Sequence, residues 1–275
     1  MKEVGKIWNS ASYNLLLLHS PPVGLEHLHC DMKRGFSKAR KKEPQVAKLL
    51  ELDNTYQRIG LLAQRGVYEF HNDMSLLGAS NGVSQVAETL ELGKESDVVQ
   101  QRVLTVLKNY YESPILVDKD IVKLSHGNED FPEPILIKLG SYSFNLYAAI
   151  DCIFKELDGT LHILDFKTGK SDFDRRQAYI YLLVASYLYP DNKPIASFYN
   201  LETNTWSKKI SASAEILEVY KYNLMQVSKK HQESLFLYRN NPDKFSQIYP
   251  ANPGTSCRYC PFTSICNFAF ISEAK

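Results

Sequence analysis

Residues 151–167 read DCIFKELDGTLHILDFK, and this stretch decides the fold. Apolar side chains recur at alternate positions on both sides of Leu157-Asp158-Gly159, which is typical of two β-strands joined by a tight turn. We expect the strands to cover residues 144–156 and 160–167. The pattern therefore predicts a β-hairpin around which the rest of an α/β fold is arranged.

The length of the turn decides which side chains lie opposite each other. A two-residue turn, Asp158-Gly159, places Asp151 opposite Phe166 and leaves Asp165 on the other face. A three-residue turn, with its glycine left-handed, places Asp151 directly opposite Asp165, with β-carbons roughly 5 Å apart. Lys167 then shares a face with Asp165. The three-residue turn is favoured because it gathers one apolar face from Leu146, Ile150, Cys152, Leu164 and Phe166.

Asp151, Asp165 and Lys167 form a candidate catalytic group. Two carboxylates in register hold a divalent cation, Mg²⁺ or Mn²⁺, and bring a water beside a phosphate. A neighbouring lysine stabilises the negative charge that develops. The alternative interpretation is a structural hairpin with one surface ion pair and no catalytic role. It stays open because a tripeptide of an acidic residue, any residue and a lysine arises by chance roughly two or three times in such a composition.

A helix is predicted over residues 173–189, with Ser171 or Asp172 as its N-cap. Gln177 and Tyr181 lie four residues apart and therefore share one face near its start. From there they would contact a nucleic-acid strand or hold the lysine; taken without the preceding hairpin, they read as ordinary helix residues.

Three of the five cysteines, Cys257, Cys260 and Cys266, lie close together. This spacing is typical of a metal or iron–sulfur site, which needs a fourth ligand from elsewhere. Cys152 belongs to the apolar alternation of a strand, which suits a core residue. Cys30 precedes a charged run and is the better fourth ligand, so we expect it to tie the two ends of the chain together.

The residues described so far carry a resemblance. Asp151, Asp165-Phe166-Lys167 and the Gln177–Tyr181 spacing resemble the PD-(D/E)XK core of the RecB-type exonuclease family. The cysteines resemble its iron–sulfur subset, which includes AddB-type nuclease domains and CRISPR-associated RecB-like exonucleases. The resemblance implies a restriction-endonuclease-like mixed central sheet flanked by helices, with a helical insertion and a cysteine-rich cluster module formed by the two chain ends.

The same resemblance implies roles for individual residues. It implies that Asp151 and Asp165 are metal ligands and that Lys167 is the catalytic lysine. It also implies that Gln177 and Tyr181 position the substrate strand. The cofactors implied are Mg²⁺ or Mn²⁺ and a 4Fe–4S cluster. The cluster ligands implied are Cys30, Cys257, Cys260 and Cys266.

The chain departs from the family pattern in two places. The family has a glycine followed four residues later by a metal-binding histidine, whereas Gly66 is followed by Phe70. Either Glu69 or His71 is expected to substitute as the third metal ligand. Asp31 stands where the family has a proline after the first cysteine.

The predicted organisation is a single nuclease domain over residues 1–275. We expect four segments in it: an N-terminal segment with Cys30 and a basic run (1–50), a helical region (51–134), a catalytic core (135–240) and a C-terminal iron–sulfur segment (241–275).

Composition limits the classes of protein. The chain is 44% hydrophobic and 23% charged, as in ordinary globular proteins. No apolar run approaches the ~18 residues that span a membrane, so a cytoplasmic protein with no membrane partner is expected. The net charge of +1 excludes a uniformly basic chain. The net charge does not reveal a local run of basic residues, which either contacts a phosphate backbone or is a solvated helix face. This run consists of Lys33, Arg34, Lys38, Arg40, Lys41 and Lys42.

These observations lead to an expected function. The protein is expected to be a metal-dependent DNA nuclease, most simply an exonuclease, in DNA repair, recombination or defence. Its partners would be DNA with a free end or a single strand, and a separate helicase or nuclease-complex subunit. The alternative is a non-catalytic iron–sulfur, DNA-binding or scaffold protein that retains the fold. Zinc is the alternative occupant of the four-cysteine site.

Overall fold

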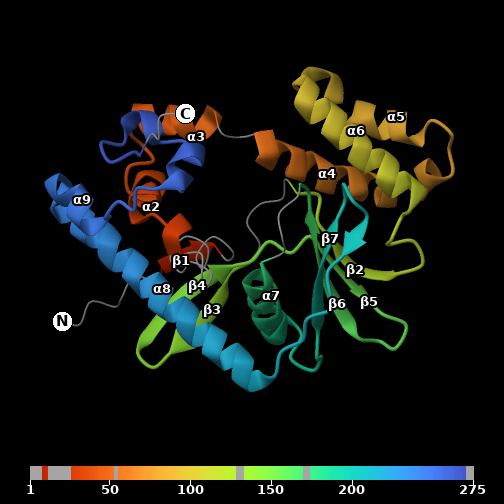
Figure 1. Cartoon of the computed structure of the whole chain (residues 1–275). Coiled ribbons are helices and arrows are strands. Elements are labelled where there is room, and N and C mark those ends of the chain that lie inside the picture. Colours follow the sequence, from red (N-terminus) through yellow and green to blue (C-terminus); the bar gives the residue numbers. More distant parts are fainter. Residues whose placement is uncertain (1–7, 12–25, 53–54, 128–132, 170–173, 271–275) are drawn as a thin grey trace. The chain divides into compact units, whose positions relative to one another are not determined.

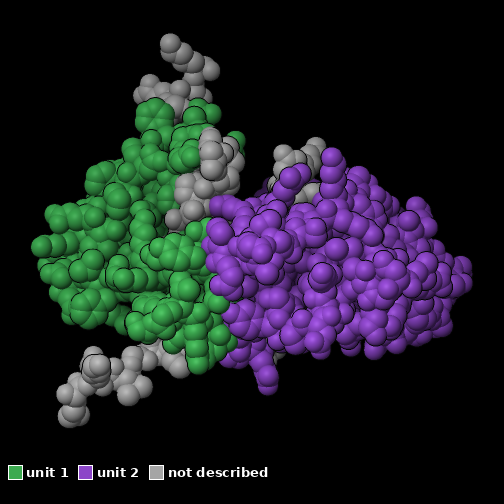
Figure 2. All heavy atoms as spheres, turned by 90° about the horizontal axis from the view of Figure 1, so that it is seen from below, with its two compact units in different colours: residues 1–54, 136–146, 221–275 green, residues 55–135, 147–220 purple. Residues whose placement is uncertain are grey.

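The computed structural model describes residues 8–11, 26–52, 55–127, 133–169 and 174–270. The chain divides into two compact units, each built from separate stretches of sequence (Figure 2). Unit 1 comprises residues 1–54, 136–146 and 221–275, and unit 2 comprises residues 55–135 and 147–220. The single-domain organisation and its four segments stay a prediction.

Unit 2 contains a five-stranded mixed sheet with the order β2-β5-β6-β7-β8 (Figure 1). The strands are β2 (Asp120–Leu124), β5 (Cys152–Lys155), β6 (Leu161–Lys167), β7 (Ile195–Asn200) and β8 (Thr205–Trp206). Only β6 and β7 are parallel, and helix α7 (Arg175–Leu188) supplies the crossover that parallel neighbours need.

The hairpin between β5 and β6 has the three-residue turn. Glu156 N donates to Thr160 O at 2.9 Å, and Gly159 has φ +83°. Cys152 pairs with Leu164, so the same register continued by one residue sets Asp151 opposite Asp165. The predicted turn and register are confirmed.

The predicted strand over residues 144–156 is wrong in its first half. β4 (Tyr142–Tyr147) pairs with β1 (Trp8–Ala11) and β3 (Ile135–Leu139) in a separate three-stranded sheet. The chain then leaves strand geometry until Cys152. Alternating burial nevertheless continues through Ala148 and Ile150. The apolar pattern of the sequence therefore does not reveal that the strand ends at Tyr147.

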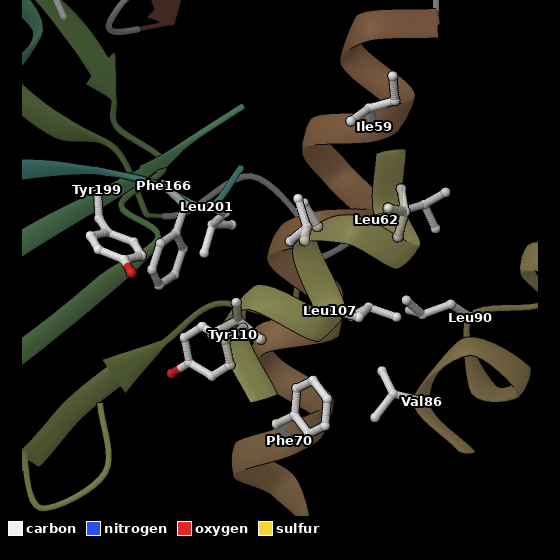
Figure 3. Close-up of a cluster of buried hydrophobic side chains, with 14 of the residues drawn as sticks. Ile59, Leu62, Phe70, Val86, Leu90, Leu107, Tyr110, Phe166, Tyr199 and Leu201 are labelled. Atoms are coloured by element: carbon white, nitrogen blue, oxygen red, sulfur yellow. The ribbon is translucent and has the colours of Figure 1, made fainter. Parts of the chain in front are cut away.

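Helices cover both faces of the five-stranded sheet. On one face, α4 (Thr55–Asn72), α5 (Gly82–Thr89) and α6 (Asp97–Glu112) form the predicted helical insertion, with short 3-10 turns at Met74–Leu77 and Leu92–Lys94. Leu107 and Tyr110 of α6 belong to one core with Phe166 and Tyr199 of the sheet (Figure 3). Gly66 lets α4 approach α6, because a β-carbon there would lie 2.3 Å from Leu107 Cδ2. The other face carries Asp165 and is covered by α7.

In unit 1, residues near the two ends of the chain pack together. Its helices are α2 (Asp31–Lys38), α3 (Pro44–Leu52), α9 (Phe245–Ile248) and α8 (Ala214–Asn240) from residue 221 onward, with 3-10 turns at Glu26–Leu28, Pro242–Lys244, Thr255–Tyr259 and Thr263–Ile265. Met32 N donates to Pro250 O at 3.1 Å, and Phe36 packs on Phe262 with ring centroids 5.1 Å apart. In the part of the chain that is described, no helix is long and apolar enough to cross a membrane.

Candidate active site and cysteine cavity

Asp165 lies at the centre of a buried polar network in unit 2. It is only 3% exposed on β6. Its Oδ1 accepts hydrogen bonds from Tyr181 OH at 2.7 Å and from Gln177 Nε2 at 3.0 Å. Its Oδ2 lies 2.7 Å from Lys167 Nζ, and no described group gives that oxygen a well-aligned hydrogen bond. One oxygen is therefore held by α7, and the other faces positive charge.

Gln177 joins the carboxylate to the lysine. While its Nε2 donates to Asp165, its Oε1 accepts from Lys167 Nζ at 2.9 Å. Gln177 Nε2 also lies 2.7 Å from Tyr181 OH, as the shared helix face predicts. Burial, and then the charge of Asp165, raise the pKa of Tyr181 well above its usual value, so this phenol stays a neutral donor. Lys167 keeps 30% of its side chain exposed, so it is less buried than the Asp165 carboxylate that it contacts.

Asp151 immediately precedes β5, and the strand register continued by one residue sets it opposite Asp165. Its Oδ2 accepts from Phe166 N at 2.8 Å, and its own carbonyl accepts from Ser125 N at 2.8 Å. The residue keeps part of its surface exposed, yet burial of the carboxyl group, and then the charge of Asp165, raise its pKa well above the usual value. Two carboxylates crowded together favour a cation between them.

These carboxylates fit a divalent cation. Asp165 Oδ2 is a buried oxygen whose only described partner is an ammonium, and Asp151 is close enough for the charge of Asp165 to raise its pKa. Oxygen donors of this kind are the ligands that Mg²⁺ and Mn²⁺ prefer. Among the described residues, no three His, Cys, Asp or Glu side chains converge on a single-ion site. Asp151 and Asp165 therefore stay predicted metal ligands.

Glu69 and His71 have other partners in the structure. Glu69 Oε1 lies 3.5 Å from both Arg65 Nε and His126 Nε2. His71 Nε2 lies 2.6 Å from Tyr110 OH, and burial lowers the pKa of His71. A third metal ligand from this helix stays a prediction.

A network that the sequence does not reveal holds the loop after Lys167. Gly169 has φ +88°, its N–H donates to Glu202 Oε2 at 3.1 Å, and its carbonyl accepts from Asn200 Nδ2 at 2.7 Å. Arg102 Nε donates to Glu202 Oε1 at 2.8 Å. These residues come from the end of β6, from α6 and from the end of β7, and no local sequence pattern connects them.

The helix after this loop begins later than expected. Its first residue is Arg175, and Asp174 is its N-cap, so the cap prediction is wrong. Asp174 accepts a hydrogen bond from Arg176 N at 3.0 Å, which is the ordinary capping contact. The two residues that the prediction named, Ser171 and Asp172, lie outside the described residues.

The four predicted cluster cysteines line one cavity of about 60 Å³ in unit 1. Cys266 Sγ lies 3.6 Å from Met32 Sδ, and Thr263 Oγ1 donates to the carbonyls of Cys257 and Cys260 at 2.7 and 2.8 Å. Burial, above all, raises the pKa of Cys260. The four thiols at this cavity are Cys30, Cys257, Cys260 and Cys266.

Four cysteines at one cavity are, by residue type, the ligands that a 4Fe–4S cluster or zinc uses. The side chains of these described residues do not converge on a single-ion site in the structure, so an occupant of this cavity stays a prediction. Lys33 also lines the cavity and opposes the rise in the Cys260 pKa, so positive charge is placed near the thiolates. Cys152, by contrast, is fully buried in the core of unit 2, as predicted.

Comparison with known proteins agrees with this geometry. A profile of the PD-(D/E)XK nuclease superfamily matches residues 27–267, which include both the carboxylate site and the four cysteines. The chain belongs to the PD-(D/E)XK nuclease superfamily, and this membership implies a nuclease with DNA as its substrate. No curated protein matches it. The crystal structure of SSO0001 is similar over 78% of this chain and 86% of its own, at 16% identity and a TM-score of 0.32, which carries no argument about function.

Proposed function

We propose that the protein is a metal-dependent DNA nuclease of the RecB type that degrades DNA from a free end. One observation carries this proposal: Lys167, Gln177 and Tyr181 surround Asp165, and Asp151 lies beside it in register. A surface ion pair does not require a buried network of hydrogen bonds around its carboxylate, so this network argues against a hairpin that carries only a surface ion pair.

The residues have distinct tasks in this proposal. Asp151 and Asp165 hold Mg²⁺ or Mn²⁺, which when bound supplies charge stabilisation at the phosphate and lowers the pKa of water. Lys167 stabilises the negative charge that develops as water attacks phosphorus. Gln177 keeps Asp165 and Lys167 in fixed relative orientation, and Tyr181 occupies Asp165 Oδ1 so that Oδ2 faces the reaction.

The cysteine cavity supports the finer assignment to the iron–sulfur subset. We propose that Cys30, Cys257, Cys260 and Cys266 hold a 4Fe–4S cluster that joins the N- and C-terminal segments of unit 1. A helicase from a separate polypeptide would supply unwound DNA.

Cleavage of labelled DNA tests the proposal. Protein purified without oxygen should degrade linear DNA with Mg²⁺ or Mn²⁺ but not with a chelator. Asp165→Ala and Lys167→Ala should lose at least about 10²-fold in kcat. Lys155→Ala is the matched control, because Lys155 is an exposed lysine on the neighbouring strand that pairs with Asp120 at the surface.

Each outcome has a clear meaning. Cleavage that survives both site variants would refute the assignment of the site. Equal cleavage of circular and linear DNA would refute action from an end. A wild-type protein that is folded, binds DNA and cleaves nothing would favour the non-catalytic scaffold instead.

A further inference from the structure

A second cavity in unit 1, of about 390 Å³, lies between the end of α2 and one face of α8. Its α8 residues, His231, Leu235, Tyr238 and Arg239, follow helical spacing and therefore share that face. The end of α2 and the segment after it contribute the other wall: Lys38, Ala39, Lys41 and Lys42.

This basic cavity has four cations and no acidic lining residue. Lys38, Lys41, Lys42 and Arg239 all line it, and the described residues give none of them an ion pair with a carboxylate. Burial, and then the charge of Lys41, lower the pKa of Lys38. Like charges gathered without a counter-charge destabilise the free protein, and a bound anion would remove that cost.

The arginines of the same sequence run serve the fold instead. Arg34 pairs with Asp31 at 3.0 Å and lies over the ring of Tyr249. Arg40 pairs with Glu43 and lies over the rings of Phe36 and Phe245. The structure thus separates the run into two arginines that pack unit 1, three lysines that line the basic cavity (Lys38, Lys41 and Lys42), and Lys33, which lines the cysteine cavity.

Glu43 is the nearest acid to the cavity along the chain, and it is already neutralised. Its carboxylate pairs with Arg40 at 2.5 Å and accepts from Tyr238 OH at 3.4 Å. Tyr238 in turn packs edge-on against Phe245, with ring centroids 5.6 Å apart. These contacts hold the cavity wall in place and leave the positive charge of the lysines without a counter-charge from Glu43.

We propose that the basic cavity binds successive phosphates of the DNA strand and anchors the nuclease substrate on unit 1. The identity of the ligand rests on the proposed function. A volume of about 390 Å³ exceeds what one phosphate fills, and the cations are spread over two chain segments, which suits a polyanion. Recognition by ammonium and guanidinium groups without base contacts would be independent of sequence.

A binding experiment without cleavage tests this site. In an Asp165→Ala background without divalent metal, the affinity for a labelled single-stranded oligonucleotide is measured by fluorescence anisotropy over a series of salt concentrations. Lys41→Ala/Lys42→Ala should weaken binding about tenfold near 0.1 M salt. It should also lower the magnitude of the log K against log[salt] slope by about 1.4, which is two phosphate contacts on a single strand.

The matched control removes the same charge elsewhere. Lys48 and Lys230 are exposed lysines of unit 1 that do not line the cavity, so Lys48→Ala/Lys230→Ala should change affinity less than about twofold. Arg239→Gln, on the opposite wall, should weaken binding in the same direction as the lysine variant. Thermal unfolding checks that every variant is folded.

Two results would overturn the proposal. In the first, the cavity variant and its control have equal affinity and equal salt slopes. In the second, the cavity variant loses affinity for inorganic pyrophosphate but keeps its affinity for DNA, which would make the cavity a small-anion site. Because binding is measured in a cleavage-deficient background, a wild-type protein that binds DNA without cutting it refutes the nuclease proposal and leaves this one standing.

Discussion

Gln177 donates from Nε2 to Asp165 Oδ1 at 3.0 Å, and the opposite end of the same amide accepts from Lys167. An amide is suited to this position because it carries a donor and an acceptor on one rigid plane. A carboxylate in its place would repel Asp165, and an aliphatic side chain would bind neither group. The side chain from α7 therefore sets the relative orientation of two groups on β6.

Removal of this bridge should slow catalysis without unfolding the protein. We expect Gln177→Ala to lower kcat about 10- to 100-fold with a smaller change in KM, since Asp165 and Lys167 lose their common support. Gln177→Glu should be at least as slow and should shift the pH–rate profile, because it adds a carboxylate beside the lysine. Single-turnover cleavage between about pH 6 and 9 measures both effects. An unchanged kcat and pH profile in both variants would exclude a positioning role.

The cysteines should divide into two groups in their effect on a bound cofactor. Cys257→Ser should abolish the visible absorption band of a 4Fe–4S cluster and lower the thermal stability of unit 1, because one ligand is lost. Cys152→Ala should keep the band and lose only roughly 1 kcal/mol, since Cys152 is a core residue of unit 2. Absorption spectra and iron content of anaerobically purified protein provide the test. A colourless wild type loaded with zinc would refute the cluster.

The turn glycine should contribute to stability through its backbone alone. Gly159 has φ +83°, and a β-carbon added there would meet no atom within 4 Å, so Gly159→Ala should cost about 1 kcal/mol of unfolding free energy. Activity should remain, because the Glu156–Thr160 pair still fixes the register. Gly93→Ala, an open position without a left-handed φ, is the control and should cost much less. Urea unfolding measures the difference, and equal losses would contradict this account.

Deletion of Gly159 is a sharper test of the same hairpin. A two-residue turn shifts the register by one, which separates Asp151 from Asp165. We expect this deletion to abolish cleavage even where the protein remains folded by circular dichroism. Retained activity would show that the carboxylates do not need to lie in register.

His231 should make the stability of the protein depend on pH. Burial, and then Arg34 and Lys38, lower its pKa to about 4 from a usual value of 6.5. Between these values the unfolded chain binds a proton that the folded chain does not, so stability falls as pH drops from 6.5 toward 4. The loss amounts to roughly 3 kcal/mol at most. Urea unfolding at about pH 7.5 and 4.5 should show a smaller loss in His231→Asn, and an equal loss would refute the assignment.

The parts of the fold that sequence could predict are those governed by local rules. The left-handed glycine at position 159 and alternating burial were enough to bring Asp151 and Asp165 together. The charged surroundings of Cys30 were enough to separate it from Cys152.

The remaining features depend on contacts between distant segments. The break between β4 and β5 leaves the alternation intact, because residues on both sides of it are buried by different partners. The clamp of Glu202 and Arg102 on the loop of Gly169 joins three segments through single side chains. His71 finds its partner on another helix, so helical spacing alone carried no information about it.

The cysteine cavity has a consequence for how the protein matures in the cell. Cys30 leaves the ribosome before any residue of unit 2, whereas Cys257, Cys260 and Cys266 follow the last of them. The cavity is therefore completed only after the last residue of unit 2 has been synthesised. Any group held by the four thiols must be bound after the carboxylate site has been synthesised. A chain released between residues 220 and 257 would carry Asp151, Asp165 and Lys167 but only one of the four cavity cysteines, Cys30.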